Sequence, residues 1–125
     1  MKKILIAEDN DSNYILMSYL LKKHYEISRA INGRDAVEKV EEGTYDLVLM
    51  DIKMPEMDGL EATSIIKSKF PSLPIIALTA NAFSSDREKA FEAGCSDFLS
   101  KPVNSDLCLE TIAKYIKMTN EVYEE

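Results

Sequence analysis

Polar side chains follow four apolar runs of the sequence, each at the point where the run ends. They are three acids, a hydroxyl and an amine: Glu8, Asp9, Asp51, Thr79 and Lys101. Because ligands of open parallel sheets bind beyond the carboxyl ends of the strands, side chains in these positions can share one site. Carboxylates, a hydroxyl and a lysine together suit the binding of Mg²⁺ and a phosphoryl group. Each position alone also fits a solvated strand end, so only their joint occurrence indicates a site.

The segments that carry these side chains predict an alternating α/β chain. Apolar or alternating runs predict five strands, at 2–7, 25–30, 45–50, 74–78 and 97–100. Helical spacing and capping signals predict five helices, at 11–24, 34–42, 58–69, 85–93 and 105–117. This alternation implies a doubly wound five-stranded parallel sheet with helices on both faces. The strands that end at Asp9 and Asp51 must be neighbours to share a site, which favours the flavodoxin-like order 2-1-3-4-5.

Three further features of these segments are expectations for the structure. The strand 25–30 is the one strand that does not end in a group suited to phosphoryl chemistry. In the helix 11–24, the apolar positions at helical spacing are Leu16, Tyr19 and Leu20, with Met17 and Leu21 beside them. The inward face predicted for the last helix consists of Leu109, Ile112, Ala113 and Ile116.

Length and composition indicate one domain, 1–125, with a tail that frays from about residue 119. The chain has 125 residues, of which 46% are hydrophobic and 30% charged. Its formal net charge of −7 argues against direct binding to nucleic acid. No apolar stretch approaches the roughly 20 residues of a membrane-spanning helix, so we expect no membrane insertion by this chain. The two cysteines form no C-x-x-C pair, and reduced thiols in a cytoplasmic protein are the simplest interpretation.

Five short segments occur in an order that is specific to one protein family. They are Glu8-Asp9-Asn10, Met50-Asp51-Ile52-Lys53-Met54-Pro55, Met57-Asp58-Gly59, Leu78-Thr79-Ala80 and Phe98-Leu99-Ser100-Lys101-Pro102. With these segments the whole chain strongly resembles the receiver domain of response regulators from two-component signalling. The segments around Glu8 and from Ala93 to Pro102 look most like receivers attached to hybrid sensor histidine kinases.

The resemblance implies a function and a set of partners. Asp51 would be the phosphoacceptor, receiving a phosphoryl group from a phosphohistidine in a Mg²⁺-dependent reaction of a phosphorelay. A conformational change at a partner surface would follow, which we place at 90–94, Phe98 and the final helix. The partners would be a sensor histidine kinase or a histidine phosphotransfer domain, and a homodimer formed on phosphorylation is also compatible with the family. The domain would catalyse only its own phosphorylation and dephosphorylation, in the cytoplasm, whether free or as part of a hybrid kinase.

The resemblance also assigns a role to each site residue. Mg²⁺, for which Mn²⁺ can substitute, would be held by Glu8, Asp9, Asp51 and the backbone carbonyl of Lys53. The phosphoryl group would contact Thr79, Ala80 and Lys101. Phe98 would be the switch aromatic, and the peptide bond between Lys101 and Pro102 would be cis.

Two other functions compete with this interpretation. A pseudo-receiver would bind partners without phosphorylation, but the set Asp9, Asp51, Thr79 and Lys101 is intact. A phosphatase of the haloacid dehalogenase type also places a nucleophilic aspartate after a strand. That family requires a second acid two residues later, where this chain has Lys53. Rossmann and P-loop nucleotide sites need glycines that the sequence lacks.

Overall fold

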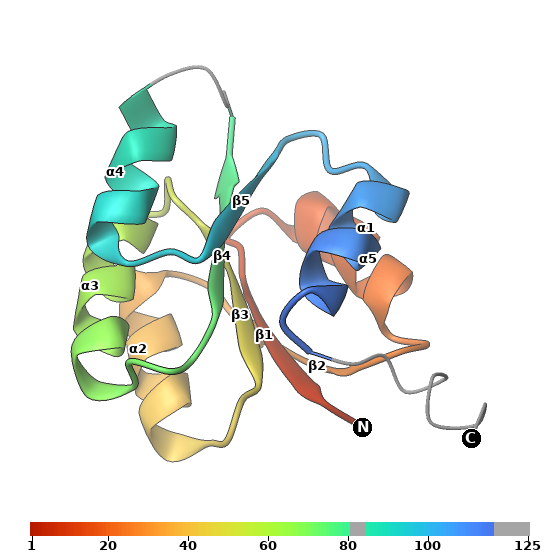
Figure 1. The fold of residues 1–125 in the computed structure, drawn as a ribbon, viewed down its shortest axis with the longest axis horizontal. Helices are drawn as coiled ribbons and strands as arrows, with labels where there is room; N and C mark the ends of the chain where they lie inside the picture. The colour runs from red at the N-terminus through yellow and green to blue at the C-terminus, as the bar shows by residue number, and fades with distance from the viewer. Residues whose placement is uncertain (81–84, 117–125) are drawn as a thin grey trace.

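A five-stranded parallel sheet lies between two layers of helices in the computed structural model, which describes residues 1–80 and 85–116 (Figure 1). The strands are β1 (Lys3–Ala7), β2 (Glu26–Ala30), β3 (Leu47–Asp51), β4 (Ile75–Thr79) and β5 (Asp97–Ser100). Their order, β2-β1-β3-β4-β5, confirms the predicted topology. β1 and β3 are therefore adjacent, so the acids that follow them lie at the same edge of the sheet.

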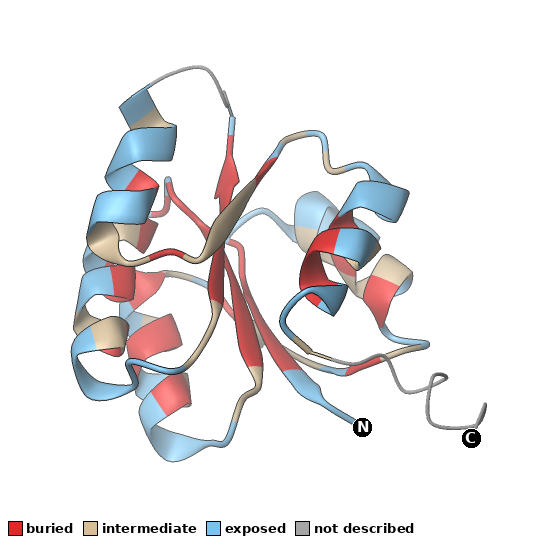
Figure 2. Ribbon diagram, in the orientation of Figure 1, coloured by how far each residue is buried: buried red, intermediate tan, exposed pale blue. Residues whose placement is uncertain are grey.

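The helices are α1 (Asp11–Leu21), α2 (Gly33–Glu42), α3 (Gly59–Lys69), α4 (Ser85–Ala93) and α5 (Ser105–Ala113). α2, α3 and α4 cover one face of the sheet, and α1 and α5 cover the other (Figure 1). Successive side chains of a strand point to opposite faces, so β3 contributes to both layers. Val48 and Met50 pack in the core under α2 and α3, whereas Leu47 and Leu49 pack in the core under α1 and α5. Figure 2 shows the resulting buried strands between partly exposed helices.

The helix boundaries agree with the sequence at their N-termini. Asn10, Asn32, Asp58 and Asn104 each accept a hydrogen bond from a backbone N–H of the first turn that follows. At the C-terminus the prediction for α1 was three residues too long. The chain leaves the helix after Leu21, whose carbonyl accepts hydrogen bonds from the N–H groups of His24 and Tyr25. The prediction for the last helix was also too long: α5 ends at Ala113 and residues 114–116 are not helical, whereas the prediction extended to 117. The predicted frayed tail lies outside the described residues.

The apolar face of α1 differs from the one predicted. Met17 and Leu21 are buried, but Leu16 is 53% exposed and Tyr19 64% exposed. α1 is apolar around most of its circumference, so the helical spacing alone did not select the stripe that meets the sheet. In α5, Ile112 is buried as predicted, whereas Ala113 is exposed.

Two glycines hold helices α2 and α3 against the loop that follows β3. The N–H of Gly59 donates to the carbonyl of Ile52 (2.8 Å), and the N–H of Gly33 donates to the carbonyl of Met57 (2.9 Å). A Cβ atom at Gly59 would lie 2.1 Å from the carbonyl oxygen of Asp51, and one at Gly33 would lie 2.2 Å from that of Met57. Only glycine permits these approaches, so the backbone after Asp51 is fixed from two sides.

Within residues 1–80 and 85–116, no helix has the length and apolar character needed to cross a membrane.

Candidate functional site

The strand order brings the predicted side chains to one edge of the sheet. Asp51 is the last residue of β3, and Thr79 is the last residue of β4. Glu8 follows β1, and Lys101 follows β5. The N–H of Lys101 donates to the carbonyl of Thr79 (2.8 Å), which ties the end of β5 to the end of β4.

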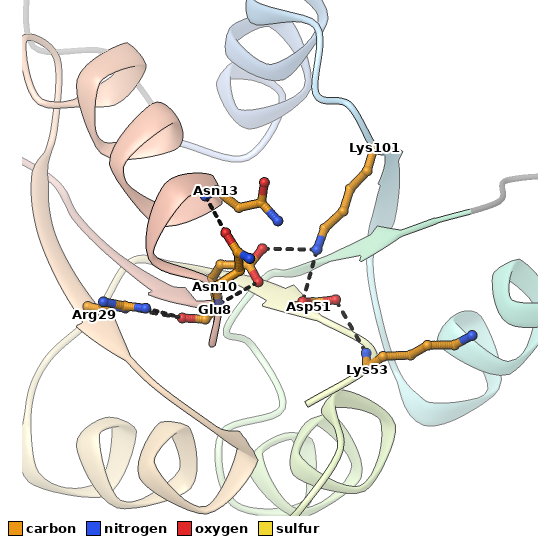
Figure 3. Close-up of polar contacts among 7 residues, drawn as sticks. All are labelled: Glu8, Asn10, Asn13, Arg29, Asp51, Lys53 and Lys101. Carbon is orange, nitrogen blue, oxygen red and sulfur yellow. Dashed lines mark hydrogen bonds and ion pairs between the residues drawn. The ribbon is translucent and has the colours of Figure 1, made fainter. Parts of the chain in front are cut away.

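One lysine ammonium contacts two carboxylates at the centre of this edge (Figure 3). The Nζ atom of Lys101 lies 2.9 Å from Oδ2 of Asp51 and 3.0 Å from Oε1 of Glu8. The contact with Asp51 has the geometry of a hydrogen bond, whereas the contact with Glu8 is an ion pair without that alignment. The predicted grouping of Glu8, Asp51 and Lys101 is therefore present.

Burial gives Glu8 and Lys101 altered proton affinities. Glu8 is completely buried, and this burial raises its pKa above 4.5. The neighbouring Asp51 raises the pKa of Glu8 further, while Lys101 opposes the shift. For Lys101, burial alone would lower the pKa, but the contacts with Asp51 and Glu8 outweigh burial and raise it. Lys101 therefore stays charged and serves as the internal counter-ion of the two acids.

The three acids meet the chemical requirements of a site for Mg²⁺. One carboxylate oxygen from each of Glu8, Asp9 and Asp51 lies within 4.8 Å of the other two. Asp9 is exposed, so the cluster opens to solvent on its side. Carboxylate oxygens beside water are the ligands that Mg²⁺ prefers. Three carboxylates against one ammonium also leave an excess of negative charge that a divalent cation would neutralise.

Lys53 lies beside Asp51 through its backbone. Its N–H donates to Oδ1 of Asp51 (3.3 Å), while its side chain is exposed and points away from Asp51 (Figure 3). A cleft of about 490 Å³ adjoins this loop and is lined by Asp9, Lys53 and Lys89 among others. The cleft therefore borders the acid cluster at Asp9 and has one lysine from the loop after β3 and one from α4.

Thr79 contributes a buried hydroxyl to the site. The residue is 1% exposed, and its Oγ1 makes no hydrogen bond to any residue in 1–80 or 85–116. Leaving a buried hydroxyl without a partner is unfavourable, which makes an incoming oxygen-rich group an effective partner. Ala80, the next residue, is exposed at the end of β4.

Phe98 lies away from the acids, at the interface of β5 and α4. Its ring is 6.0 Å from the Phe91 ring in an edge-on arrangement, and the Arg87 guanidinium lies 4.8 Å from its centroid. Phe98 is half-buried and Phe91 is exposed, within the predicted partner surface. The peptide bond between Lys101 and Pro102 is cis, as the resemblance implied.

Arg29 also joins the site, although the sequence analysis did not predict it. It comes from β2, the strand that was expected to contribute nothing, and its guanidinium contacts the loop that carries Glu8 and Asp9 (Figure 3). The sequence signal that could have indicated this role is a cationic residue one position before the end of β2, the strand that pairs with β1.

Comparison with known proteins identifies the family of this arrangement. The family model described as "Response regulator receiver domain" matches residues 4–113. Hybrid signal transduction histidine kinase B of Dictyostelium discoideum is 42% identical over 93% of this chain, but the match spans only 7% of that kinase. The polar-differentiation response regulator DivK of Brucella anthropi is 38% identical, with 92% of this chain and 96% of DivK covered. The chain thus spans less than a tenth of the hybrid kinases that it matches and nearly all of the single-domain regulator.

Solved structures give the same result. The receiver domain of sensor histidine kinase PA1611 from Pseudomonas aeruginosa, with a magnesium ion coordinated in its active site cleft, is similar with a TM-score of 0.86. It is 35% identical, with 91% of this chain and 96% of that one covered. The receiver domain of Ssk1 from Saccharomyces cerevisiae, solved with the histidine phosphotransfer protein Ypd1, gives a TM-score of 0.86. The identity is 32%, with 91% and 88% covered. With the family match, the strand order and the acid cluster in agreement, the chain belongs to the response regulator receiver domains of two-component signalling.

Proposed function

We propose that Asp51 accepts a phosphoryl group from a phosphohistidine and that this chain acts as a switch in a phosphorelay. The observation that carries the proposal is the surroundings of Asp51. Its carboxylate contacts the ammonium of Lys101 and lies in a cluster of acids. It is also close in the sheet to the Thr79 hydroxyl, which has no hydrogen-bond partner within 1–80 and 85–116. The fully formed cluster favours phosphorylation over the pseudo-receiver alternative, and no observation favours a phosphatase of the haloacid dehalogenase type.

The proposed reaction is an in-line displacement at phosphorus. A carboxylate oxygen of Asp51 forms a bond to phosphorus as the P–N bond of the donor breaks, and the electron pair of that bond stays on the imidazole. Lys101 neutralises charge on the phosphoryl oxygens, and the Thr79 hydroxyl and the Ala80 backbone bind them. Glu8, Asp9, Asp51 and the Lys53 carbonyl would hold Mg²⁺ or Mn²⁺. The bound cation supplies positive charge for the transferred group.

A histidine phosphotransfer domain or a sensor histidine kinase is the proposed donor. The structural similarity to a receiver solved with a histidine phosphotransfer protein supports a donor of this kind. Relatives include both hybrid kinases and a single-domain regulator, so the donor histidine can belong to the same polypeptide or to another one. Two free, buried cysteines among the described residues are compatible with work in the reducing cytoplasm.

Phe98 and α4 are the proposed output. Movement of Thr79 towards a phosphoryl group would open space beside β4 and β5, into which the Phe98 ring can turn. Full burial of a phenylalanine is worth about 1.5–3 kcal/mol, enough to shift the population of two surface states. A new surface over α4, β5 and α5 would then bind a partner or a second copy of the chain.

Phosphorylation by acetyl phosphate in the presence of Mg²⁺ tests the proposal. We expect intact-mass spectrometry to show the addition of one phosphoryl group to the wild-type chain and none to Asp51→Asn. Asp106→Asn is the matched control, because it makes the same substitution at an exposed position of α5. Equal labelling of wild type and Asp51→Asn would refute the proposal, as would labelling that persists in excess EDTA.

A further inference from the structure

Arg29 contacts the acid loop on the side opposite Lys101 (Figure 3). Its Nε and Nη2 atoms donate to the backbone carbonyl of Glu8 at 3.1 and 3.0 Å. Its Nη1 atom lies 2.9 Å from Oδ1 of Asp11. The guanidinium also lies over the ring of Tyr14, with its carbon 4.7 Å from the ring centroid. One side chain thus contacts the backbone before Asp9 and two residues of the helix after it.

The bonds from Arg29 fix the peptide group that joins Glu8 to Asp9. The carbonyl of Glu8 and the N–H of Asp9 belong to the same planar unit, so two hydrogen bonds to that carbonyl set the orientation of the whole unit. The Asp9 carboxylate is exposed, and its position therefore depends on the backbone that carries it. The N–H of Glu8 is held from the same strand, by the carbonyl of Ala30 (3.0 Å).

The chemistry of arginine suits this task better than that of another cation. Its planar guanidinium presents donors in a fixed fork, remains charged at all working pH values and stacks on aromatic rings. The Arg29 side chain is 23% exposed, so its hydrogen bonds are partly shielded from water. The same group neutralises Asp11, a fourth acid near the cluster, without occupying the carboxylates of Glu8, Asp9 or Asp51.

We propose that Arg29 is a positioning residue that orients the Glu8–Asp9 peptide for binding of a divalent cation. The inference rests on the proposed function for the identity of the cation, and it concerns affinity rather than the transfer step. Loss of the guanidinium would leave the loop free to sample other orientations, and each binding event would then have to restore the correct one. Arg29 acts only through the loop, so saturating Mg²⁺ should restore the normal rate of phosphorylation.

Titration calorimetry with Mg²⁺ at fixed ionic strength, in the absence of a phosphodonor, tests this role. We expect Arg29→Met to raise the Kd for Mg²⁺ about tenfold, as is usual when a group that orients a metal ligand is lost. Arg29→Lys keeps the charge but loses the forked arrangement of donors. Its Kd for Mg²⁺ should lie between those of the wild type and Arg29→Met. Arg34→Met is the matched control: it removes the same charge from an exposed position of α2 and should bind Mg²⁺ like the wild type.

Several outcomes would overturn the inference. An unchanged Kd in Arg29→Met, with only a lower melting temperature in EDTA, would show that Arg29 serves stability alone. If Arg34→Met weakened Mg²⁺ binding as much as Arg29→Met, or if Arg29→Lys bound Mg²⁺ like the wild type, overall charge would be responsible for the affinity. If Arg29→Met does not fold, the Kd of Arg29→Lys for Mg²⁺, compared with that of the wild type, decides whether Arg29 orients the loop. A wild-type chain that binds Mg²⁺ in this manner but never labels Asp51 would refute the proposed function and not the role of Arg29.

Discussion

Lys101 places its ammonium in contact with two carboxylates, Glu8 and Asp51, while Asp9 completes the acid cluster. This arrangement leaves more negative than positive charge in a partly buried place. Like charges at such distances repel and disfavour ionisation. A cation that binds only the folded chain therefore stabilises it by mass action, and the stabilisation grows with the logarithm of its concentration above its Kd.

Glu8 is the residue at which this repulsion can be measured. Burial raises its pKa, so the folded chain holds the Glu8 proton more tightly than the unfolded chain does. This contribution to stability is fully present below the unfolded pKa of about 4.5 and is lost as pH rises through the folded value. At neutral pH without metal, we therefore expect Glu8→Gln to raise the melting temperature and to reduce its increase on addition of Mg²⁺. Thermal unfolding in EDTA and in millimolar Mg²⁺ measures both effects.

Glu110→Gln provides the comparison for Glu8→Gln, because Glu110 is an exposed acid of α5. It should leave both melting temperatures close to wild type. A Glu8→Gln variant that is less stable than wild type in EDTA would mean that the ion pair with Lys101 outweighs the burial of the charge.

The sequence predicted the acids, the hydroxyl and the lysine because each lies at or just after the end of an apolar run. It did not predict Arg29, whose partners are a backbone carbonyl and the residues Asp11 and Tyr14. Backbone acceptors have no sequence signature, so a residue that acts on them becomes visible only in three dimensions. That the Thr79 hydroxyl has no hydrogen-bond partner among the described residues is likewise a property of its surroundings.

At the scale of the elements, the contact between α3 and the end of β3 links the fold to the site. Gly59, the first residue of α3, lies so close to Asp51 that a Cβ atom would be 2.1 Å from its carbonyl oxygen. The clash involves backbone and cannot be relieved by a side-chain rotation. We expect Gly59→Ala to lower the free energy of unfolding by about 1–3 kcal/mol, the usual range for overpacking a tight site. Urea denaturation measures this loss.

Ser64→Ala is the matched substitution for Gly59→Ala, because Ser64 is an exposed residue of the same helix. It should change the free energy of unfolding by less than about 0.5 kcal/mol. Similar stability in the two variants would show that α3 can move away from Asp51 at little cost. Weaker Mg²⁺ binding by Gly59→Ala would in addition show that the position of the loop matters to the site.

The elements were predictable wherever the sequence has a single dominant pattern. The continuous apolar run at 47–50 predicted a buried strand, and every residue of β3 is buried. Asp58 three residues before Glu61 predicted the start of α3, and the Asp58 side chain accepts a hydrogen bond from the N–H of Glu61. α1 has apolar residues on nearly every side, so only its packing on the sheet shows that Met17 faces inward and Tyr19 outward. Which side of α1 faces the sheet depends on the direction in which the chain enters the helix. No local sequence pattern specifies that direction.

At the scale of the whole molecule, each of the two cores contains one cysteine. Cys95 belongs to the core under α2, α3 and α4, and Cys108 to the core under α1 and α5. Burial raises the pKa of each thiol from 9.0 to about 11. The stability linked to these protons is complete below pH 9 and is lost as pH rises towards about 11, because the unfolded thiols ionise first.

These two thiols make it possible to follow the cores separately. The thiolate is the reactive form, and a pKa shift of about two units lowers its fraction near pH 8 about hundredfold. We expect both thiols to react with a thiol-specific reagent at least about hundredfold more slowly in the folded chain than in guanidinium chloride. Peptide mass spectrometry assigns the rate at each site. Rapid labelling of Cys95 or Cys108 in the folded chain would contradict its burial and would identify the core that opens.

α4 is attached to the rest of the molecule by less buried surface than the other helices. Ala90 is its one buried residue, whereas α2 and α3 bury four each. Most positions of α4 therefore contribute little to folding, and substitutions there escape the constraint that preserves the core. Receivers that descend from a common ancestor can diverge along this helix without loss of the acid site at the ends of the strands. Related pathways would then share the acids of the site, and the exposed residues of α4 would be what distinguishes one pathway from another.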